Sequence, residues 1–353
     1  MSTLYLVDLE AVESRYTGEW KTFLPKRLSD YVQTNNLDWN VRVVYGIDDI
    51  PTATTPGAFL NFGGTNMYKS SQLLLIAEMF CNGQVQPGDK FLYTDAWNPT
   101  ILQVKYMSEL LQIPVEIHAL WHAGSYDPQD FLGRLIGPAR WVRHTEMAMM
   151  NAIDCNWFAT QFHIDMFTRV FDIERSKVCL TGWPMEYLKN TLSLENQKED
   201  IILFPHRIAP EKQVDIFKDL ARRMPDYEFI VCQEENLSKA EYHTLLRKSK
   251  IVFSGNLQET LGISCYEGAL SGALPMVPNR LSYSEMYTNT FKYPSLWTES
   301  YEDYLAHADL VESFIREWIT NYDSIVKELP ELTNQLDSFF SCDNLLKGIF
   351  NGK

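Results

Sequence analysis

Short apolar segments alternate with helical segments along this chain, and the alternation restarts once near its middle. From residue 1 to about residue 182, apolar runs bounded by Gly, Pro, Asp or Asn predict strands at 3–9, 41–45, 58–62, 91–94, 115–120, 156–159 and 178–180. Apolar residues with helical spacing predict helices around 23–32, 70–80, 100–111 and 141–151. This order of strands and helices indicates a parallel sheet with helices on both faces.

The pattern returns after Gly182-Trp183-Pro184 and the polar stretch 193–200, which together are typical of a linker. It predicts strands at 201–204, 228–232, 251–253 and 274–277, and helices at 211–223, 239–248, 263–271 and 306–321. The expected fold class is therefore α/β, with two Rossmann-like, doubly wound domains at 1–183 and 184–330. Because ligands bind at the carboxyl ends of such sheets, we expect the domains to face across a cleft and to take one substrate each.

Composition narrows the class of protein. The 31 basic and 46 acidic residues give a net charge of −15, which argues against extensive binding to nucleic acid but leaves a local basic groove open. No run approaches the roughly 18 apolar residues of a membrane span, and Asp8 comes too early for a secretion signal. The six cysteines are scattered, without the paired spacing of a zinc site. These features predict a soluble, cytoplasmic protein.

The first chemically informative segment is 204–212, FPHRIAPEK. It places Arg207 on the loop after a predicted strand and Lys212 in the first turn of the next helix, with four residues between them. Both cations then converge at a helix N-terminus, where the dipole and the free amides already favour an anion. The alternative is a solvated Arg and Lys that flank a helix cap.

The second segment is 258–275, QETLGISCYEGALSGALP. Glu259 and Glu267 are separated by seven residues, and Gly262 between them allows the backbone to approach a ligand. A Glu just before a helix can accept sugar hydroxyls, and one two turns into the helix can hold a ribose. A capping residue and an exposed helix face are the alternative.

Together the two segments resemble the nucleotide-sugar domain of retaining glycosyltransferases of the GT-B fold, of the family 4 type. That family has an Arg and a Lys at this spacing and then, after two more β/α units, two Glu residues seven residues apart. The resemblance covers most of the chain, including 113–122 and 141–188, which follow the family's strand before the acceptor cleft and its transition into the hinge. It implies transfer of a sugar from a nucleotide-diphosphate sugar, with a UDP-sugar as the expected donor, to a hydroxyl group. It also implies that a C-terminal helix in 331–353 packs back on the N-terminal domain.

The resemblance assigns roles to the four charged residues. Arg207 and Lys212 bind the donor diphosphate and stabilise the leaving group, and Glu267 holds the donor ribose. Glu259 binds the hydroxyls of the transferred sugar and is counted among the catalytic residues. Because no pair of carboxylates is seen to flank the anomeric carbon, we expect front-face transfer with retention, in which the departing phosphate helps to deprotonate the acceptor.

Three further positions complete the expected centre. The amides of Leu261 and Gly262 lie beside the transferred sugar, and His122 matches a family position near the reaction centre, with a structural histidine as the alternative. His118 and His122 are four residues apart on a predicted strand rather than on a helix, which argues against a metal pair. No Asp-x-Asp metal signature is present, so we expect an enzyme that needs neither a metal nor a cofactor.

The first loop departs from the family pattern. It usually carries two adjacent glycines against the donor phosphate, whereas 13–20, ESRYTGEW, offers only Gly18 for that donor contact, and we expect Arg15 and Tyr16 to bind the acceptor. Asp95 ends a predicted strand, and the short run 92–95, LYTD, also resembles the catalytic-base segment of the phage β-glucosyltransferase that modifies DNA. A strand-end Asp that caps the next helix is the alternative.

The acceptor is the most open part of the prediction. The N-terminal sequence resembles glycosyltransferases encoded by large tailed phages, for which a 5-hydroxymethylated pyrimidine in double-stranded DNA is a plausible acceptor and the host cytoplasm the expected location. Trp97 and Trp121 would then stack on an extruded base. A glycan, lipid or small-molecule acceptor stays open, as do a non-catalytic nucleotide-sugar-binding protein and an epimerase or phosphorylase of the same architecture.

Overall fold

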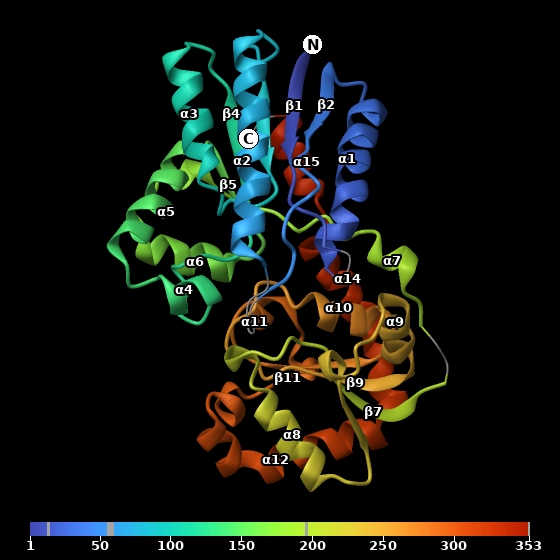
Figure 1. Ribbon diagram of the computed structural model, residues 1–353. Helices are drawn as coiled ribbons and strands as arrows, with labels where there is room; N and C mark the ends of the chain where they lie inside the picture. Colours follow the sequence, from blue (N-terminus) through green and yellow to red (C-terminus); the bar gives the residue numbers. More distant parts are fainter. Residues whose placement is uncertain (13–14, 55–59, 195–196, 352–353) are drawn as a thin grey trace. The chain divides into compact units, whose positions relative to one another are not determined.

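The protein is described by a computed structural model that covers residues 1–12, 15–54, 60–194 and 197–351 (Figure 1). Packing divides it into two compact units. Unit 1 consists of Met1–Pro184 and Cys342–Lys353, and unit 2 of Met185–Ser341. Each unit is built on a parallel sheet, which confirms the predicted α/β class with two doubly wound domains.

Unit 1 contains a six-stranded sheet in the order β2-β1-β3-β4-β5-β6. Its strands are β1 (Ser2–Val7), β2 (Trp39–Val44), β3 (Lys90–Tyr93), β4 (Glu116–Trp121), β5 (Cys155–Phe158) and β6 (Val178–Leu180). Its helices are α1 (Tyr16–Thr34), α2 (Phe62–Cys81), α3 (Thr100–Leu110), α4 (Phe131–Leu135), α5 (Arg140–Ala152), α6 (Gln161–Val170) and α15 (Asp343–Phe350). Since parallel crossovers are right-handed, α1 covers one face of the sheet while α2, α3 and α5 cover the other.

The core of unit 1 explains why these segments are helices and strands. Buried apolar side chains of α2, α3 and α5 pack on those of β3 and β4, where the central strands are apolar on both faces. On α1 the buried residues recur every three or four positions, which gives the helix one apolar face: Thr17, Trp20, Leu24, Leu28 and Val32.

The last helix of the chain belongs to unit 1. In α15, Leu345, Leu346 and Ile349 are fully buried, and the Ile349 carbonyl accepts a hydrogen bond from Lys90 Nζ at 2.7 Å. Gly348 lies against the indole of Trp157 so closely that a Cβ there would be 2.3 Å from the ring. The segment 331–353, expected to hold one helix, is divided: α14 (Leu329–Leu336) lies in unit 2 and α15 in unit 1.

Unit 2 contains a five-stranded sheet in the order β11-β10-β9-β7-β8. Its strands are β7 (Glu199–Phe204), β8 (Glu228–Val231), β9 (Ser249–Phe253), β10 (Leu274–Pro278) and β11 (Lys292–Tyr293). Besides α14, its helices are α7 (Leu188–Thr191), α8 (Val214–Arg223), α9 (Lys239–Lys248), α10 (Ile263–Leu270), α11 (Tyr283–Met286), α12 (Tyr301–Thr320) and α13 (Tyr322–Ile325). Helices α8 and α12 pack together on one face, and α9, α10 and α14 cover the other.

Two predicted elements differ from the structure. The strand expected at 58–62 falls partly on residues outside those described, and Phe62 begins helix α2, whose N-cap Asn61 accepts a hydrogen bond from the Gly64 amide. The helix expected at 211–223 is interrupted. A short 3₁₀ turn, η2 (Pro210–Lys212), precedes it, and Gln213 adopts a left-handed conformation before α8 begins. Lys212 therefore ends this turn and does not lie in the first turn of α8.

Each sheet has one point at which successive crossovers leave in opposite directions. In unit 1 it lies between β1 and β3, and in unit 2 between β7 and β9. The loops that follow these strands diverge at the carboxyl edge of the sheet, which is where doubly wound folds bind ligands. Of the described residues, no helix combines the length and apolar character required to cross a membrane.

Candidate functional site

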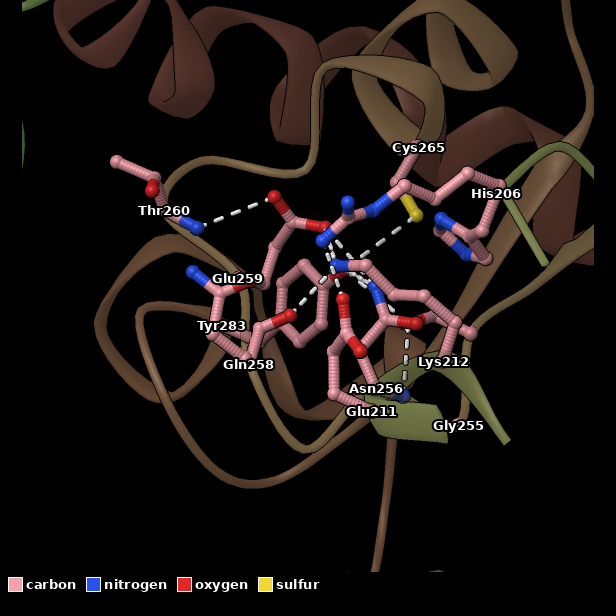
Figure 2. Close-up of polar contacts among 12 residues, drawn as sticks. His206, Glu211, Lys212, Gly255, Asn256, Gln258, Glu259, Thr260, Cys265 and Tyr283 are labelled. Carbon is pink, nitrogen blue, oxygen red and sulfur yellow. Dashed lines mark hydrogen bonds and ion pairs between the residues drawn. The ribbon is translucent and has the colours of Figure 1, made fainter. Parts of the chain in front are cut away.

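The switch point of unit 2 brings together a lysine and a glutamate from different loops (Figure 2). Lys212 follows β7 and Glu259 follows β9, and Lys212 Nζ lies 3.1 Å from Glu259 Oε2. The same ammonium donates to the carbonyl oxygen of Gln258 at 2.6 Å. Both side chains are largely buried, with exposed fractions of 8% and 17%. The lysine and the glutamate that the sequence analysis singled out therefore contact each other directly.

Glu259 is held on both of its carboxylate oxygens. Asn256 Nδ2 donates to Oε2 at 2.9 Å, and the Thr260 amide donates to Oε1 at 3.1 Å. Burial alone raises the pKa of this carboxyl, but the charge of Lys212, together with hydrogen bonds from Lys212 and the Gly262 amide, outweighs it and lowers the pKa to about 2. Glu259 is thus a fixed anion at neutral pH.

Arg207, the other predicted cation, lies on the loop after β7. Its guanidinium donates to Glu211, whose side chain is fully buried, while that of Arg207 is 30% exposed. A buried carboxylate needs a cationic or hydrogen-bonding partner, so Glu211 belongs to this site although the sequence motif gave it no role. The Glu211 carbonyl also accepts from the Leu257 amide at 2.8 Å, which joins the loops that follow β7 and β9.

The segment before α10 has the backbone geometry expected of a ligand-facing turn. Gly262 is the N-cap of α10 and has a φ of +69°, which L side chains rarely adopt. A Cβ at this position would also lie 2.6 Å from the Tyr283 ring. Leu261 beside it is buried. Glycine is therefore required at the start of the helix whose N-terminal amides were predicted to face the donor.

Glu267 lies in the second turn of α10. Tyr242 Oη donates to its Oε2 at 2.9 Å, and His243 Nε2 lies 4.0 Å from Oε1. Burial raises the pKa of Glu267 to about 7, although the Tyr242 hydrogen bond and the charge of Lys239 act in the opposite direction. The pKa of Glu267 is therefore raised, whereas that of Glu259, the other glutamate of the motif, is lowered.

His206 also lies on the loop after β7, next to Arg207. Its Nε2 lies 3.2 Å from the Phe253 carbonyl oxygen at the end of β9. Burial and then the charge of Lys212 lower the pKa of His206 to about 4. The imidazole is therefore neutral at pH 7 and links the two loops of the switch point.

The carboxyl edge of the sheet in unit 1 carries a second lysine–carboxylate pair. Asp95 follows β3, and its Oδ2 lies 3.0 Å from Nζ of Lys69 on α2. Lys69 also donates to the Trp97 carbonyl at 2.9 Å, and the Trp97 amide donates to Asp95 Oδ1 at 3.0 Å. Burial opposes ionisation of Asp95, but Lys69 prevails and the pKa of Asp95 falls below its ordinary value.

His122 immediately follows β4 and has both ring nitrogens engaged. Nε2 lies 2.6 Å from the Thr94 carbonyl oxygen and Nδ1 lies 2.6 Å from Tyr16 Oη. Because a carbonyl can only accept, Nε2 carries the hydrogen and Nδ1 accepts from the Tyr16 hydroxyl. Burial lowers the pKa of His122, which is consistent with this neutral tautomer. The rings of Trp20 and Trp183 pack around the pair at 5.5 and 4.5 Å from the imidazole centroid.

His118 lies in a different environment from His122. The His118 Nδ1 accepts from Trp157 Nε1 at 3.1 Å, and its Nε2 lies 2.9 Å from Glu116 Oε1. Within the described ranges, no three His, Cys, Asp or Glu side chains form a group suited to a metal ion.

The structure corrects the predicted contact of Trp121 and the predicted local conformation of Gly18. Trp121 is 1% exposed and donates to Asn156 Oδ1 at 2.8 Å, so it is a core residue and cannot stack on an acceptor base. Gly18 lies inside α1, with its amide bonded to the Arg15 carbonyl at 3.0 Å, and is not a loop glycine. Helix α1 begins at Tyr16, before the helical stretch predicted around 23–32.

The other acceptor-side predictions keep some access to solvent. Arg15 precedes α1, and its guanidinium carbon lies 5.7 Å from the centroid of the Tyr16 ring. Trp97 is partly buried and donates from Nε1 to Glu146 at 2.7 Å.

Several residues of these sites carried no recognised signal in the sequence. Lys69 lies 26 positions before Asp95, on a helix whose polar face cannot be assigned from spacing. Asn256 is fully buried beside Glu259, and Arg280 follows β10 and contacts the same loop. A charged residue just beyond a buried strand was the one available hint for Arg280.

Comparison with solved structures places the fold in a known group. The sucrose-phosphate synthase of Thermosynechococcus elongatus matches with a TM-score of 0.63 and 11% identity, over 98% of this chain and 96% of its own. WaaG, a glycosyltransferase involved in lipopolysaccharide biosynthesis, matches with a TM-score of 0.60 and 12% identity, over 99% and 100% of the two chains.

TarM matches with a TM-score of 0.56 and 12% identity over 86% of this chain, which spans only 63% of the length of TarM. One TarM structure is a complex that contains UDP. No protein-family model matches the sequence, and neither does any curated protein. At these identities the likeness concerns the fold, which is that of GT-B glycosyltransferases.

Proposed function

We propose that this chain is a glycosyltransferase that transfers a sugar from a nucleotide-diphosphate sugar to a hydroxyl group, without a metal and with retention at the anomeric carbon. The observation that carries the proposal is the convergence of Arg207, Lys212 and Glu259 at the switch point of unit 2, with Glu267 on the following helix. The fold and the family 4 spacing of these residues support the same function.

The chemistry of the donor explains the choice of residues. Cleavage of the bond between the anomeric carbon and the diphosphate places negative charge on the leaving group. Fixed positive potential stabilises that charge, and it comes from Arg207, Lys212 and the amides at the start of α10. In the described state both cations already contact carboxylates, so the diphosphate has to compete with Glu211 and Glu259 for them.

Glu267 is proposed to accept hydrogen bonds from the donor ribose. Tyr242 occupies Oε2, so Oε1 is the oxygen offered to the ligand. Glu259, an anion at neutral pH, is proposed to accept from the hydroxyls of the transferred sugar. UDP is the nucleotide proposed, a choice supported by its presence in a TarM complex.

Unit 1 is proposed to supply the acceptor side. His122 and Asp95 lie at the carboxyl edge of its sheet, where the Tyr16 hydroxyl and a carboxylate can orient an incoming hydroxyl group. In front-face transfer the departing phosphate takes the acceptor proton. Asp95 and His122 would then orient the acceptor and set the local electrostatic potential, and neither would take its proton. This role agrees with an Asp95 that is already ionised and paired with Lys69.

A 5-hydroxymethylated pyrimidine in DNA is the specific acceptor proposed. Trp141 supports it, since its ring is 59% exposed at the start of α5 and follows Arg140. The burial of Trp121 and the net charge of −15 favour the alternative, a glycan, lipid or small molecule. The experiment below therefore includes both kinds of acceptor.

The test is release of nucleoside diphosphate from a panel of labelled UDP-, ADP- and GDP-sugars, with and without EDTA. We expect release from one donor, unaffected by EDTA, and its loss in Arg207→Ala, Lys212→Ala and Glu267→Ala. Lys218→Ala, which removes an exposed ion pair with Glu234, is the matched control. Binding without release indicates the non-catalytic alternative, and full activity in any of the three site variants refutes the assignment.

The acceptor is tested with the same labelled donor. Hydroxymethylated DNA, ordinary DNA and a glycan mixture are incubated in parallel. Label on hydroxymethylated DNA alone supports the DNA proposal, and label on none of the nucleic acids rejects it. The stereochemistry of the product, read by NMR, decides between retention and inversion.

A further inference from the structure

Arg280 lies two residues beyond β10, and its guanidinium donates hydrogen bonds to backbone carbonyls. Nε donates to the Asn256 carbonyl at 2.7 Å, and Nη2 donates to those of Gly255 at 2.7 Å and Thr298 at 3.1 Å. Nη1 donates to the Ser295 carbonyl at 3.0 Å. One side chain therefore fixes four carbonyls from two loops, and the planar fork of an arginine suits this task better than the single ammonium of a lysine.

Gln213, which lies before these loops in the sequence, donates hydrogen bonds to two of the same carbonyls. Its Nε2 donates to the carbonyls of Gly255 at 2.6 Å and Thr298 at 2.7 Å. Gln213 has a φ of +55°, a conformation that a glutamine rarely adopts, and it directly follows Lys212. We call Arg280 and Gln213 together the carbonyl clamp.

The clamp acts on the loop that positions Glu259. Asn256, whose carbonyl Arg280 holds, is fully buried and donates from its side chain to Glu259 Oε2 at 2.9 Å. Lys212, next to Gln213, donates to Glu259 and to the Gln258 carbonyl. The two groups that bond to Glu259 Oε2 are thus linked to the clamp: Arg280 holds the backbone of Asn256, and Lys212 directly precedes Gln213.

The charge on Arg280 supports a positioning role. None of the ion pairs between described residues includes Arg280, and burial lowers its pKa. Arg280 is partly buried and its guanidinium bonds to carbonyls in place of a carboxylate, and removing a cation from water is costly, so its position on this loop needs a reason beyond packing.

We propose that Arg280 is a positioning residue that, with Gln213, holds the segment from Gly255 to Glu259 so that the Glu259 carboxylate faces the donor sugar. The catalytic consequence rests on the function proposed above. Arg280 itself does not touch the substrate in this arrangement. Its loss should therefore affect turnover of the sugar donor more than affinity for the nucleotide.

The experiment compares Arg280→Ala and Arg280→Lys with wild type and with Arg316→Ala, a partly exposed arginine 3.8 Å from Asp226 in the same unit. Gln213→Gly is the second clamp variant, because glycine accepts the left-handed backbone and removes only the side chain. The readouts are the Kd for UDP by calorimetry, kcat and KM for hydrolysis of a UDP-sugar, and amide hydrogen exchange.

We expect Arg280→Ala to lower kcat by about 100-fold, the scale of misplacing a reacting group by about 1 Å, with the Kd for UDP changed by less than about threefold. Exchange should rise at 255–262 and stay at wild-type values in β7 and α8. Added guanidinium ion should restore part of kcat in Arg280→Ala, and Arg316→Ala should match wild type.

Wild-type kcat together with wild-type exchange at 255–262 in Arg280→Ala overturns the proposal. A loss of UDP affinity as large as the loss of kcat overturns it too, since that result indicates general damage to the site. If Arg280→Ala does not fold, the same outcomes are read from Arg280→Lys and Gln213→Gly. If wild type neither binds UDP nor hydrolyses any donor, the proposed function fails, and the exchange data alone decide whether the clamp orders the loop.

Discussion

The two sheets carry nearly identical lysine–carboxylate pairs at their carboxyl edges. Lys69 and Asp95 in unit 1 are 3.0 Å apart with side chains 9% and 17% exposed, and Lys212 and Glu259 in unit 2 are 3.1 Å apart with side chains 8% and 17% exposed. In each pair the lysine also donates to a backbone carbonyl within two residues of the carboxylate. Both pairs lie beside the point at which the crossovers change direction.

The surroundings of the two pairs differ in kind. Aromatic rings and a neutral imidazole adjoin the pair in unit 1, with His122 close enough to affect the pKa of Asp95. In unit 2, Glu211 next to Lys212 pairs with Arg207, and Glu259 accepts from the backbone amides of Thr260 and of Gly262, the N-cap of α10. Under the proposed function, the pair in unit 1 would serve an uncharged hydroxyl acceptor and the pair in unit 2 a diphosphate, so the neighbours of each ion pair would set its role.

The largest expected effect is on the Kd for UDP, and it distinguishes the two pairs. Each pair is neutralised in turn by a double substitution. Lys212→Met with Glu259→Gln should weaken UDP binding by at least about 100-fold, because a charge-assisted contact to the diphosphate is lost. Lys69→Met with Asp95→Asn should leave the Kd for UDP within about twofold of wild type. Calorimetry on the two double variants decides the matter, and equal losses in both would contradict the division of roles.

The next effect should be shared by the two pairs. Lys69→Ala and Lys212→Ala each leave a buried carboxylate without its cation, and each should lower the free energy of unfolding by about 3 kcal/mol. That change corresponds to a fall in Tm of roughly 6 to 12 °C in differential scanning calorimetry. Lys248→Ala, which removes an exposed pair with Glu199, should change Tm by less than about 2 °C. A Tm near wild type in only one lysine variant would show that the pairs are not energetically alike.

A smaller effect concerns pH and the two glutamates of unit 2. The pKa of Glu267 is raised to about 7 and that of Glu259 is lowered to about 2, so of these two glutamates Glu267 is the one that titrates near neutrality. Its ionised fraction rises from about one tenth at pH 6 to about nine tenths at pH 8, and affinity for a UDP-sugar should rise by up to about tenfold over that interval. A UDP-sugar is used because its diphosphate has no ionisation of its own in this range.

Glu267→Gln should abolish that dependence, since glutamine does not titrate. The sign for stability is opposite to that for binding: a carboxyl with a raised pKa contributes stability at low pH and loses it as the pH rises through 7. A binding curve that stays pH-dependent in Glu267→Gln would assign the titration to another group.

The smallest effect compares two left-handed glycines. Gly262 in unit 2 and Gly83 in unit 1 have φ values of +69° and +66°, but only Gly262 has a neighbour, Tyr283, within reach of a Cβ. Gly83→Ala should cost about 1 kcal/mol from backbone strain alone, whereas Gly262→Ala should cost more because the tyrosine has to move. An equal loss of unfolding free energy in the two variants, measured by chemical denaturation, would mean that the Tyr283 side chain moves away at little cost.

The sequence predicted much of the fold because alternation of strand and helix depends on local apolar pattern, which these segments carry strongly. The family resemblance implied that Lys212, Glu259 and Glu267 serve one donor site, and in the structure Lys212 and Glu259 are in contact. The break at Gln213 was missed because nothing in a glutamine signals a left-handed backbone.

The site residues of unit 1 were harder to predict for physical reasons. Trp121 and His122 are adjacent, yet Trp121 is in the core as the last residue of β4, whereas His122 follows the strand at the carboxyl edge of the sheet. Lys69 reaches Asp95 from a separate helix, and a contact across 26 positions depends on tertiary packing. Gly18 was expected in a loop because the start of α1 has no capping side chain to mark it.

The position of α15 in unit 1 has a consequence for the order in which the chain is made. All of unit 2 leaves the ribosome before residues 342–351, so unit 2 can complete its sheet while unit 1 still lacks its last helix. Until then the Trp157 indole and the Lys90 ammonium have no α15 to contact. The unit whose strands are made first therefore depends on a helix that is made after all of the other unit.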